Sequence, residues 1–172
     1  MSKKIIFVCK GNMNRSPIAE RVFKRELEKR KITNIEVDSY ALQGFILPPT
    51  KGKSLKDYPK EYAFSLPYIK KLKISMEDHI SKPLTKKVMK NSDIIITMSK
   101  EIHDNLLKHF PEFENKTFLI SSISKTKVDL EDVDGSNDEN MYKRTIENTE
   151  KLVLEIFGNI LKKLGEEIEK NS

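Results

Sequence analysis

The chain has 172 residues, 37% of them hydrophobic and 34% charged, which is typical of one globular domain with a core of its own. Its net charge is +6, but the basic residues are spread along the sequence, so we expect no nucleic-acid partner. No apolar run reaches the roughly 18 residues that a membrane span requires, so we expect no membrane partner either.

The chain contains one cysteine, Cys9. One cysteine cannot form an internal disulfide, and no group of cysteines and histidines has the spacing of a metal site. A lone thiol is typical of a reducing compartment, and the first residues lack the pattern of a signal peptide. We therefore expect a cytoplasmic protein that acts as a monomer, with neither a metal ion nor a cofactor.

The first predicted element is a strand over residues 3–9, "KKIIFVC", a β-branched and aromatic run that ends before a glycine-containing turn. A helix follows from Pro17, because apolar residues then recur at helical spacing and proline suits a first helical turn. Further strands are predicted over residues 34–40, 92–99 and 116–122. Further helices are predicted over residues 84–91, 100–110 and 146–164.

Strands that alternate with helices predict an α/β fold. We expect a single three-layer domain over residues 1–172, in which a four-stranded parallel sheet has helices on both faces and a phosphate-binding loop follows the first strand. Residues 44–70 contain four of the seven prolines, and we interpret them as a long loop with partial structure. A loop of that length inside one domain is often functional.

The segment between the first strand and the first helix carries the candidate chemistry. In α/β folds, anions bind at the carboxyl ends of strands and at helix N-termini. Cys9 ends the strand and Arg15 opens the helix, so a nucleophilic thiolate and a guanidinium fork are expected to face the same anion. Gly11 and Asn12 tolerate the left-handed backbone that turns N–H groups inward. The predicted phosphate-binding residues around this pair are Lys10, Gly11, Asn12, Met13, Asn14 and Ser16.

The segment "FVCKGNMNRSPIAE" resembles the phosphate loop of the low-molecular-weight protein tyrosine phosphatases, and "VDSYALQG", "DHISKPLT" and "NSDIIITMSKEIHDNLLKHFP" extend the resemblance over most of the chain. It implies that Cys9 attacks the phosphorus of a phosphorylated protein or peptide while Arg15 holds the equatorial oxygens. It also implies that Ser16 stabilises the Cys9 thiolate, that Asn12 holds the loop in a strained form, and that His79 fixes Asn12 and Ser16.

The general acid is where the sequence departs from the family, which carries an Asp-Pro pair in a late loop, often followed by aromatic residues. The corresponding segment here is "VDLEDVDGSNDENMY", with four competing aspartates: Asp129, Asp132, Asp134 and Asp138. Asp132 fits best, because "DVDG" matches Asp-Pro-x-Gly with Val133 in place of proline, and Asp134 is second. Five aromatic residues could replace the missing aromatic wall: Tyr40, Phe45, Tyr58, Tyr62 and Tyr142.

Three functions follow from these residues. The first is hydrolysis of phosphotyrosine in proteins through a cysteinyl-phosphate intermediate, with Asp132 as general acid. The second is a protein-arginine phosphatase with the same loop, because an acidic "DVDGSNDE" segment suits a guanidinium leaving group. The third, from a different class, is a module that binds phosphate without catalysis.

Overall fold

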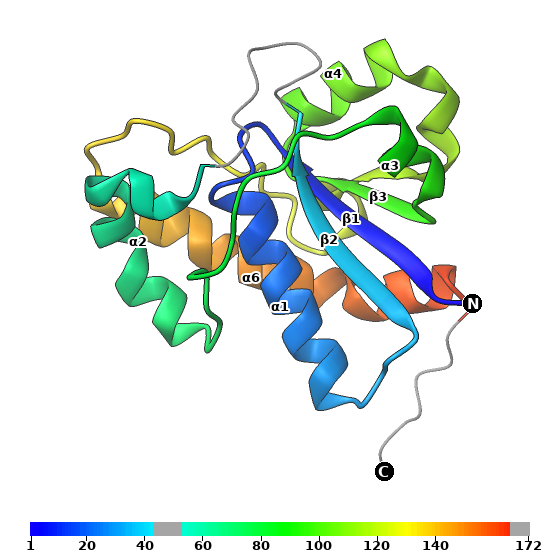
Figure 1. Cartoon of the computed structure of the whole chain (residues 1–172), viewed down its shortest axis with the longest axis horizontal. Helices are drawn as coiled ribbons and strands as arrows, with labels where there is room; N and C mark the ends of the chain where they lie inside the picture. The colour runs from blue at the N-terminus through cyan, green and yellow to red at the C-terminus, as the bar shows by residue number, and fades with distance from the viewer. Residues whose placement is uncertain (43–52, 166–172) are drawn as a thin grey trace.

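Four parallel strands form one sheet in the computed structural model, which describes residues 1–42 and 53–165 (Figure 1). The order across the sheet is β2-β1-β3-β4. The strands are β1 (Lys3–Cys9), β2 (Ile35–Ala41), β3 (Ile94–Thr97) and β4 (Thr117–Leu119). The chain leaves β1 toward β2 on one side, and β3 pairs with β1 on the other. The carboxyl end of β1 is therefore next to the point where the strand order reverses, which is where open α/β sheets bind ligands.

Helices cover both faces of the sheet, as Figure 1 shows. Side chains alternate along β1: Ile5 and Phe7 pack into one core cluster, and Ile6 and Val8 pack into the other. The first cluster lies under α1 (Arg15–Lys29), α2 (Pro59–Lys71), α5 (Ile120–Ile123) and α6 (Glu139–Lys163). The second lies under α3 (Lys86–Asn91), α4 (Lys100–His109) and the 3₁₀ helix η2 (Pro111–Lys116). The predicted three-layer α/β domain is thereby confirmed.

Residues 44–70, interpreted as a long loop with partial structure, contain more regular structure than that in their second half. The 3₁₀ helix η1 (Leu55–Asp57) leads into α2, a helix of 13 residues. Pro59 occupies the first turn of α2, where its missing N–H costs no hydrogen bond. Pro67 lies inside the helix on its exposed side, while Ser65 and Ile69 are buried toward the core. Residues 44–52 of that predicted loop lie outside the described residues.

The last strand is also shorter than predicted. Strand β4 ends at Leu119, and the next residues turn into the short helix α5 instead of continuing to residue 122. The turn is stabilised locally, because the Ser122 hydroxyl donates to the Leu119 carbonyl and the Ser124 N–H donates to the Ile120 carbonyl.

Within residues 1–42 and 53–165, no helix combines the length and the hydropathy that crossing a membrane would require.

Candidate active site

The loop after β1 turns around the sulfur of Cys9. Residues 10–14 form successive bends, and α1 begins at Arg15. Asn14, the residue before α1, makes no side-chain hydrogen bond to the first turn of the helix. Asn12 adopts a left-handed backbone with φ of 54°, a conformation that asparagine tolerates better than most residues. The positive φ reverses the chain direction within the loop, and the Asn12 N–H points toward the Cys9 sulfur.

Cys9 lies at the bottom of this loop and is only 3% exposed. Its sulfur is 2.9 Å from the Ser16 hydroxyl oxygen, and the Asn12 N–H donates to it over 3.2 Å. Because Ser16 already accepts a hydrogen bond from the Asn12 amide (3.0 Å), its hydroxyl proton is directed to the sulfur. The sulfur therefore receives two hydrogen bonds, one from a side chain of α1 and one from the backbone of the loop.

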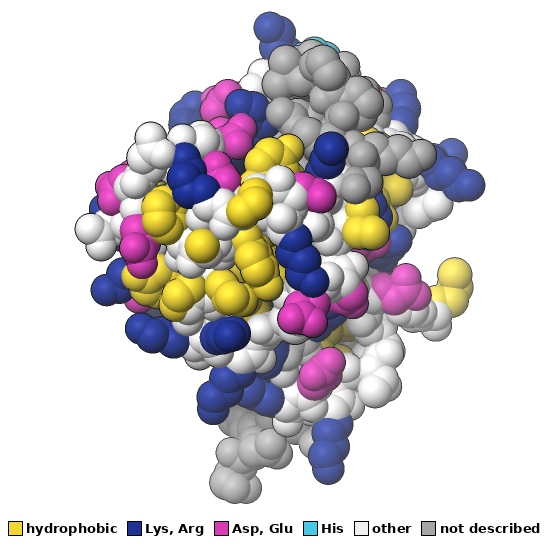
Figure 2. Space-filling view, turned by 60° about the vertical axis from the view of Figure 1, so that its left-hand side comes forward, with side chains coloured by type: hydrophobic (Ala, Val, Ile, Leu, Met, Phe, Trp, Pro, Cys, Tyr) yellow, Lys and Arg dark blue, Asp and Glu magenta, His cyan; other side chains and the backbone are white. Residues whose placement is uncertain are grey.

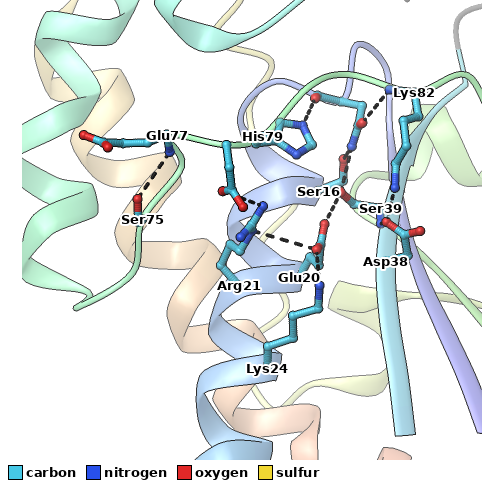
Figure 3. A network of polar contacts seen from close by, with 12 residues as sticks. Ser16, Glu20, Arg21, Lys24, Asp38, Ser39, Ser75, Glu77, His79 and Lys82 are labelled. Carbon is cyan, nitrogen blue, oxygen red and sulfur yellow. Dashed lines mark hydrogen bonds and ion pairs between the residues drawn. The ribbon is translucent and has the colours of Figure 1, made fainter. Parts of the chain in front are cut away.

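A chain of hydrogen bonds connects Ser16 to a buried carboxylate of α1. The Asn12 side-chain amide donates both to Ser16 and to the Ser39 hydroxyl (2.9 Å), and Ser39 in turn donates to Glu20 (2.6 Å). Figure 3 shows Ser16, Ser39 and Glu20 along this path. Glu20 is 3% exposed and forms an ion pair with Lys24 (2.6 Å). The path joins β2 to the start of α1, so the loop is held from two elements.

His79 and Lys82, from the segment before α3, complete the contacts of Asn12 (Figure 3). The His79 Nε2 atom lies 2.7 Å from the Asn12 carbonyl oxygen, and the Lys82 backbone N–H donates to the Asn12 side-chain oxygen over 3.0 Å. A carbonyl oxygen only accepts, so Nε2 carries the proton and donates. Burial lowers the pKa of His79, although this hydrogen bond acts in the opposite direction. The lowered pKa favours the neutral ring at neutral pH.

Arg15, Lys10 and Asp132 lie together in the pocket that Cys9 also lines. Arg15 is 6% exposed and donates to the Leu130 carbonyl (3.2 Å). Its second terminal nitrogen lies 3.7 Å from one Asp132 oxygen, and the Lys10 Nζ lies 3.7 Å from the other. The Asp134 N–H donates to Asp132 over 3.1 Å. One carboxylate and two cations therefore face the same space as the Cys9 sulfur.

These groups line a pocket of about 250 Å³ that extends from Cys9 to the surface. Besides the loop, its walls are formed by Leu55, Tyr58, Glu61, Val133, Asp134 and Tyr142. Leu55, Tyr58 and Glu61 come from η1 and the start of α2, and Tyr142 comes from α6. Figure 2 shows hydrophobic side chains exposed among lysine and arginine side chains on the face turned forward from the left of Figure 1, where α2 lies.

The structure gathers the predicted loop residues around Cys9 and separates the competing aspartates. Asp132 and Asp134 line the pocket, whereas Asp129 accepts the N–H of Lys100 and Asp138 caps α6. The predicted aromatic wall is partly realised. Tyr58 and Tyr142 line the pocket, the Tyr40 hydroxyl donates to Asp38, Tyr62 packs against the first core cluster, and Phe45 lies outside the described residues.

Four residues of this site were missed from the sequence: Leu55, Glu61, Glu20 and Ser39. Leu55 and Glu61 lie in the segment interpreted as a loop, where a helical period was overlooked because of the prolines. Glu20 looked like an ordinary exposed residue of an amphipathic helix, although it lies one turn after Ser16.

Among the described residues, no group of three or more histidine, cysteine, aspartate or glutamate side chains could hold a metal ion.

Comparison with known proteins gives a consistent picture. The family model described as "Low molecular weight phosphotyrosine protein phosphatase" matches residues 4–170. A protein-arginine-phosphatase of Bacillus subtilis is 28% identical over 92% of this chain and 97% of its own length. The low molecular weight protein-tyrosine-phosphatase Wzb of Escherichia coli is 28% identical over 69% of this chain and 70% of its own length.

Solved structures agree with the fold. The low molecular weight protein tyrosine phosphatase from T. tengcongensis superimposes with a TM-score of 0.75 at 25% identity, covering 92% of this chain and 99% of that one. The YwlE arginine phosphatase from Geobacillus stearothermophilus gives 0.75 at 22% identity, covering 97% and 99%. The four-stranded three-layer architecture is therefore shared with these proteins.

Proposed function

The chain belongs to the low molecular weight phosphotyrosine protein phosphatase family of cysteine-dependent hydrolases, and we propose that it hydrolyses phosphotyrosine in proteins through a cysteinyl-phosphate intermediate. The observation that carries this proposal is one pocket whose lining includes the nearly buried Cys9, Arg15 and Asp132. A nearly buried sulfur is reached only by a phosphate on a long side chain. Apolar and aromatic walls suit a phenyl ring between the phosphate and the protein surface.

In the proposed first step, Cys9 attacks phosphorus and the bond to the phenolic oxygen breaks. Arg15 and the inward-facing loop amides hold the equatorial oxygens, whose charge they balance in the transition state. Asp132 gives its proton to the departing phenolate. In this structure Arg15 and Lys10 form ion pairs with Asp132. A phosphate dianion bound in the loop would pair with these two cations in place of Asp132.

In the second step, the Asp132 carboxylate takes a proton from a water molecule that attacks the cysteinyl phosphate. The bond between sulfur and phosphorus breaks, and inorganic phosphate and the Cys9 thiolate are released. Ser16 holds the thiolate in both steps, and Asn12, supported by His79, keeps the loop in its left-handed conformation.

A second candidate substrate is phosphoarginine. The pocket wall carries two carboxylates besides Asp132, those of Glu61 and Asp134, and a guanidinium leaving group is cationic. The similarity to the Bacillus subtilis protein-arginine-phosphatase also covers more of this chain than the similarity to Wzb. The same loop and the same nucleophile serve both reactions.

The test compares one peptide sequence that carries phosphotyrosine, phosphoarginine or phosphoserine at the same position. Phosphate release is followed at neutral pH with a phosphate sensor protein, because acidic colour reagents hydrolyse phosphoarginine. We expect the kcat/KM for phosphotyrosine to exceed that for phosphoserine by roughly a hundredfold or more. Binding of phosphate without turnover of any peptide would instead indicate a non-catalytic module.

Glu61→Gln and Asp134→Asn distinguish the two candidates, with Glu28→Gln on the exposed side of α1 as the matched control. If phosphotyrosine is the substrate, both variants retain its kcat/KM within about threefold, since they remove charges that a neutral ring does not use. If phosphoarginine is the substrate, both lose activity selectively on that peptide. A phosphoarginine preference in the unmodified enzyme would overturn the first candidate in favour of the second.

We also propose that the protein acts on phosphorylated proteins as a cytoplasmic monomer. A thiolate nucleophile requires a reducing compartment, because oxidation of the only cysteine would stop turnover. Light scattering coupled to size-exclusion chromatography should give a mass near 20.0 kDa. A mass of about 40 kDa at the working concentration of the enzyme would contradict the monomer.

A further inference from the structure

The hydroxyl of Tyr142 holds both ends of the turn that carries Asp132 and Asp134. Tyr142 lies in the first turns of α6 and is 1% exposed, with its ring in the pocket wall. Its hydroxyl oxygen lies 2.9 Å from the Val133 carbonyl oxygen and 3.2 Å from that of Ser136. Both partners only accept, so the tyrosine donates a single proton that the two carbonyls share.

The turn itself is short and relies on few bonds. The Ser136 N–H donates to the Val133 carbonyl over 3.0 Å, and Gly135 supplies a left-handed φ of 70°. Within it, the Asp134 N–H donates to an Asp132 oxygen and so orients that carboxylate. No proline fixes φ at position 133, which leaves the direction of this turn to its hydrogen bonds.

We propose that Tyr142 is a positioning residue, whose hydroxyl fixes the turn over residues 132–136 so that Asp132 faces the leaving group above Cys9. This inference rests on the proposed role of Asp132 as the general acid. Tyr142 acts through the backbone carbonyls of Val133 and Ser136, and the reacting atoms are contacted by Asp132.

The surroundings of Tyr142 suit a permanent donor. Burial, together with the negative charges of Glu61, Asp134 and Asp132, raises the pKa of Tyr142 to about 12. The hydroxyl therefore keeps its proton throughout the pH range in which a cysteine phosphatase works. The ring packs against Phe64 of α2 at a centroid distance of 5.5 Å and an interplanar angle of 56°, so its position is defined by packing on two helices.

The test is Tyr142→Phe, which keeps the ring and removes only the hydroxyl. We measure kcat/KM, which reports the step in which the leaving group departs, for phenyl phosphate and for 2,4-dinitrophenyl phosphate. Phenolate needs the proton of the acid, whereas dinitrophenolate leaves without it. Proper placement of a general acid is worth a large part of its roughly hundred- to ten-thousand-fold effect, so we expect a loss of about tenfold on phenyl phosphate. The loss on the activated substrate should stay within about twofold.

Tyr68→Phe is the matched control, since the Tyr68 hydroxyl of α2 also bonds to α6, at Glu139 over 3.3 Å, but outside the pocket. Tyr68→Phe should leave kcat/KM unchanged for both substrates. Asp132→Asn supplies the second comparison. Adding Tyr142→Phe to Asp132→Asn should cause no further loss on phenyl phosphate, because a positioning residue has no effect once the group that it positions is gone.

Equal losses on both substrates, or a full additional loss in the Asp132→Asn background, would assign Tyr142 a merely structural role and overturn the inference. If Tyr142→Phe does not fold, Gly135→Ala perturbs the same turn, because alanine is strained at φ of 70° although open space surrounds its Cβ. It should show the same dependence on the leaving group. If Asp132→Asn alone shows no such dependence, the acid assignment fails and this inference fails with it. If Asp132→Asn shows it and neither turn variant does, only this inference fails.

Discussion

Asn12 is the residue of the loop that links the other parts of the site to one another. Its left-handed backbone directs its own N–H to Cys9, and its side-chain amide bridges Ser16 and Ser39. Its carbonyl and side-chain oxygens are held by His79 and Lys82. A buried polar side chain with all these bonds satisfied has one conformation, which is how a loop keeps a strained backbone in the absence of substrate.

The first prediction concerns the nucleophile. Cys9→Ser should abolish turnover, a fall of roughly a thousandfold or more, because a serine hydroxyl does not ionise near neutral pH. Phosphate and vanadate binding should persist, since Arg15 and the loop amides are unchanged. Steady-state hydrolysis of p-nitrophenyl phosphate and calorimetric titration with phosphate measure the two effects separately. Turnover near the parent rate would exclude Cys9 as the nucleophile.

The second prediction concerns the two aspartates of the pocket. Asp132 contacts both Arg15 and Lys10, the two cations of the proposed phosphate site. Asp132→Asn should lower kcat/KM on phosphotyrosine about a hundredfold or more, and much less on an activated ester, because only the poor leaving group needs a proton. Asp134→Asn serves as the control and should do little. The reverse pattern would move the general acid by two residues.

At the scale of one element, α1 links the loop to the rest of the fold. Its first turn carries Arg15 and Ser16, and its last turns carry Glu26, which bonds to Lys29 (2.9 Å) and Arg30 (2.8 Å). Arg25 of the same helix donates to the Leu72 carbonyl beyond α2 and pairs with Glu150 of α6. The three helices on this face are thereby connected at the end opposite the pocket.

The third prediction concerns Glu26, whose partners Arg25, Lys29 and Arg30 belong to α1 and its C-terminal cap. Burial opposes its charge, but hydrogen bonds from Arg30, Lys29 and Arg25 outweigh the burial and lower the pKa of Glu26 to about 2. Because the folded-state pKa lies below the ordinary value of 4.5, its stabilisation is present above pH 4.5 and is lost as the pH falls toward 2. Glu26→Gln should therefore lower the free energy of unfolding at pH 7 by roughly 1–2 kcal/mol.

Urea unfolding at several pH values measures this effect. The difference between the parent and Glu26→Gln should shrink between pH 4.5 and 2, where the parent loses the contribution. Glu28→Gln, on the exposed side of the same helix, is the control and should stay within about 0.5 kcal/mol at every pH. A difference that is independent of pH would show that the charge of Glu26 is not the cause.

At the scale of the whole molecule, the sheet is buried on both faces, by α1, α2 and α6 on one side and by α3 and α4 on the other. The pocket is formed only where segments distant in sequence meet: the loop after β1, the start of α2, the turn at residues 132–136 and the start of α6. The pocket therefore depends on the packing of α1, α2 and α6 against one face of the sheet.

The fourth prediction tests whether the two core clusters unfold together. Leu152→Ala in α6 and Leu106→Ala in α4 each remove a fully buried leucine, one from each cluster. Each should lower the free energy of unfolding by about 2–5 kcal/mol, in a single transition that coincides by far-ultraviolet and near-ultraviolet circular dichroism. Leu154→Ala, at a leucine that is 44% exposed, is the matched control and should change it by about 0.5 kcal/mol or less. Two separate transitions would show that the layers fold independently.

The sequence by itself determined the alternation of strands and helices along the chain, the α/β class and the loop from Cys9 to Arg15. These features depend on local periodicity and on a short contiguous motif. It also placed the candidate general acid among four aspartates and ranked Asp132 first and Asp134 second. In the structure Asp132 and Asp134 line the pocket, because a loop without proline takes its direction from hydrogen bonds to residues outside the turn, such as those of Tyr142. Helix α2 was missed because it contains two prolines, one in its first turn and one on its exposed side. The carboxylate of Glu20 entered the loop network for a similar reason: its partner Ser39 lies 19 residues away, on a neighbouring strand, and only the folded chain brings the two together.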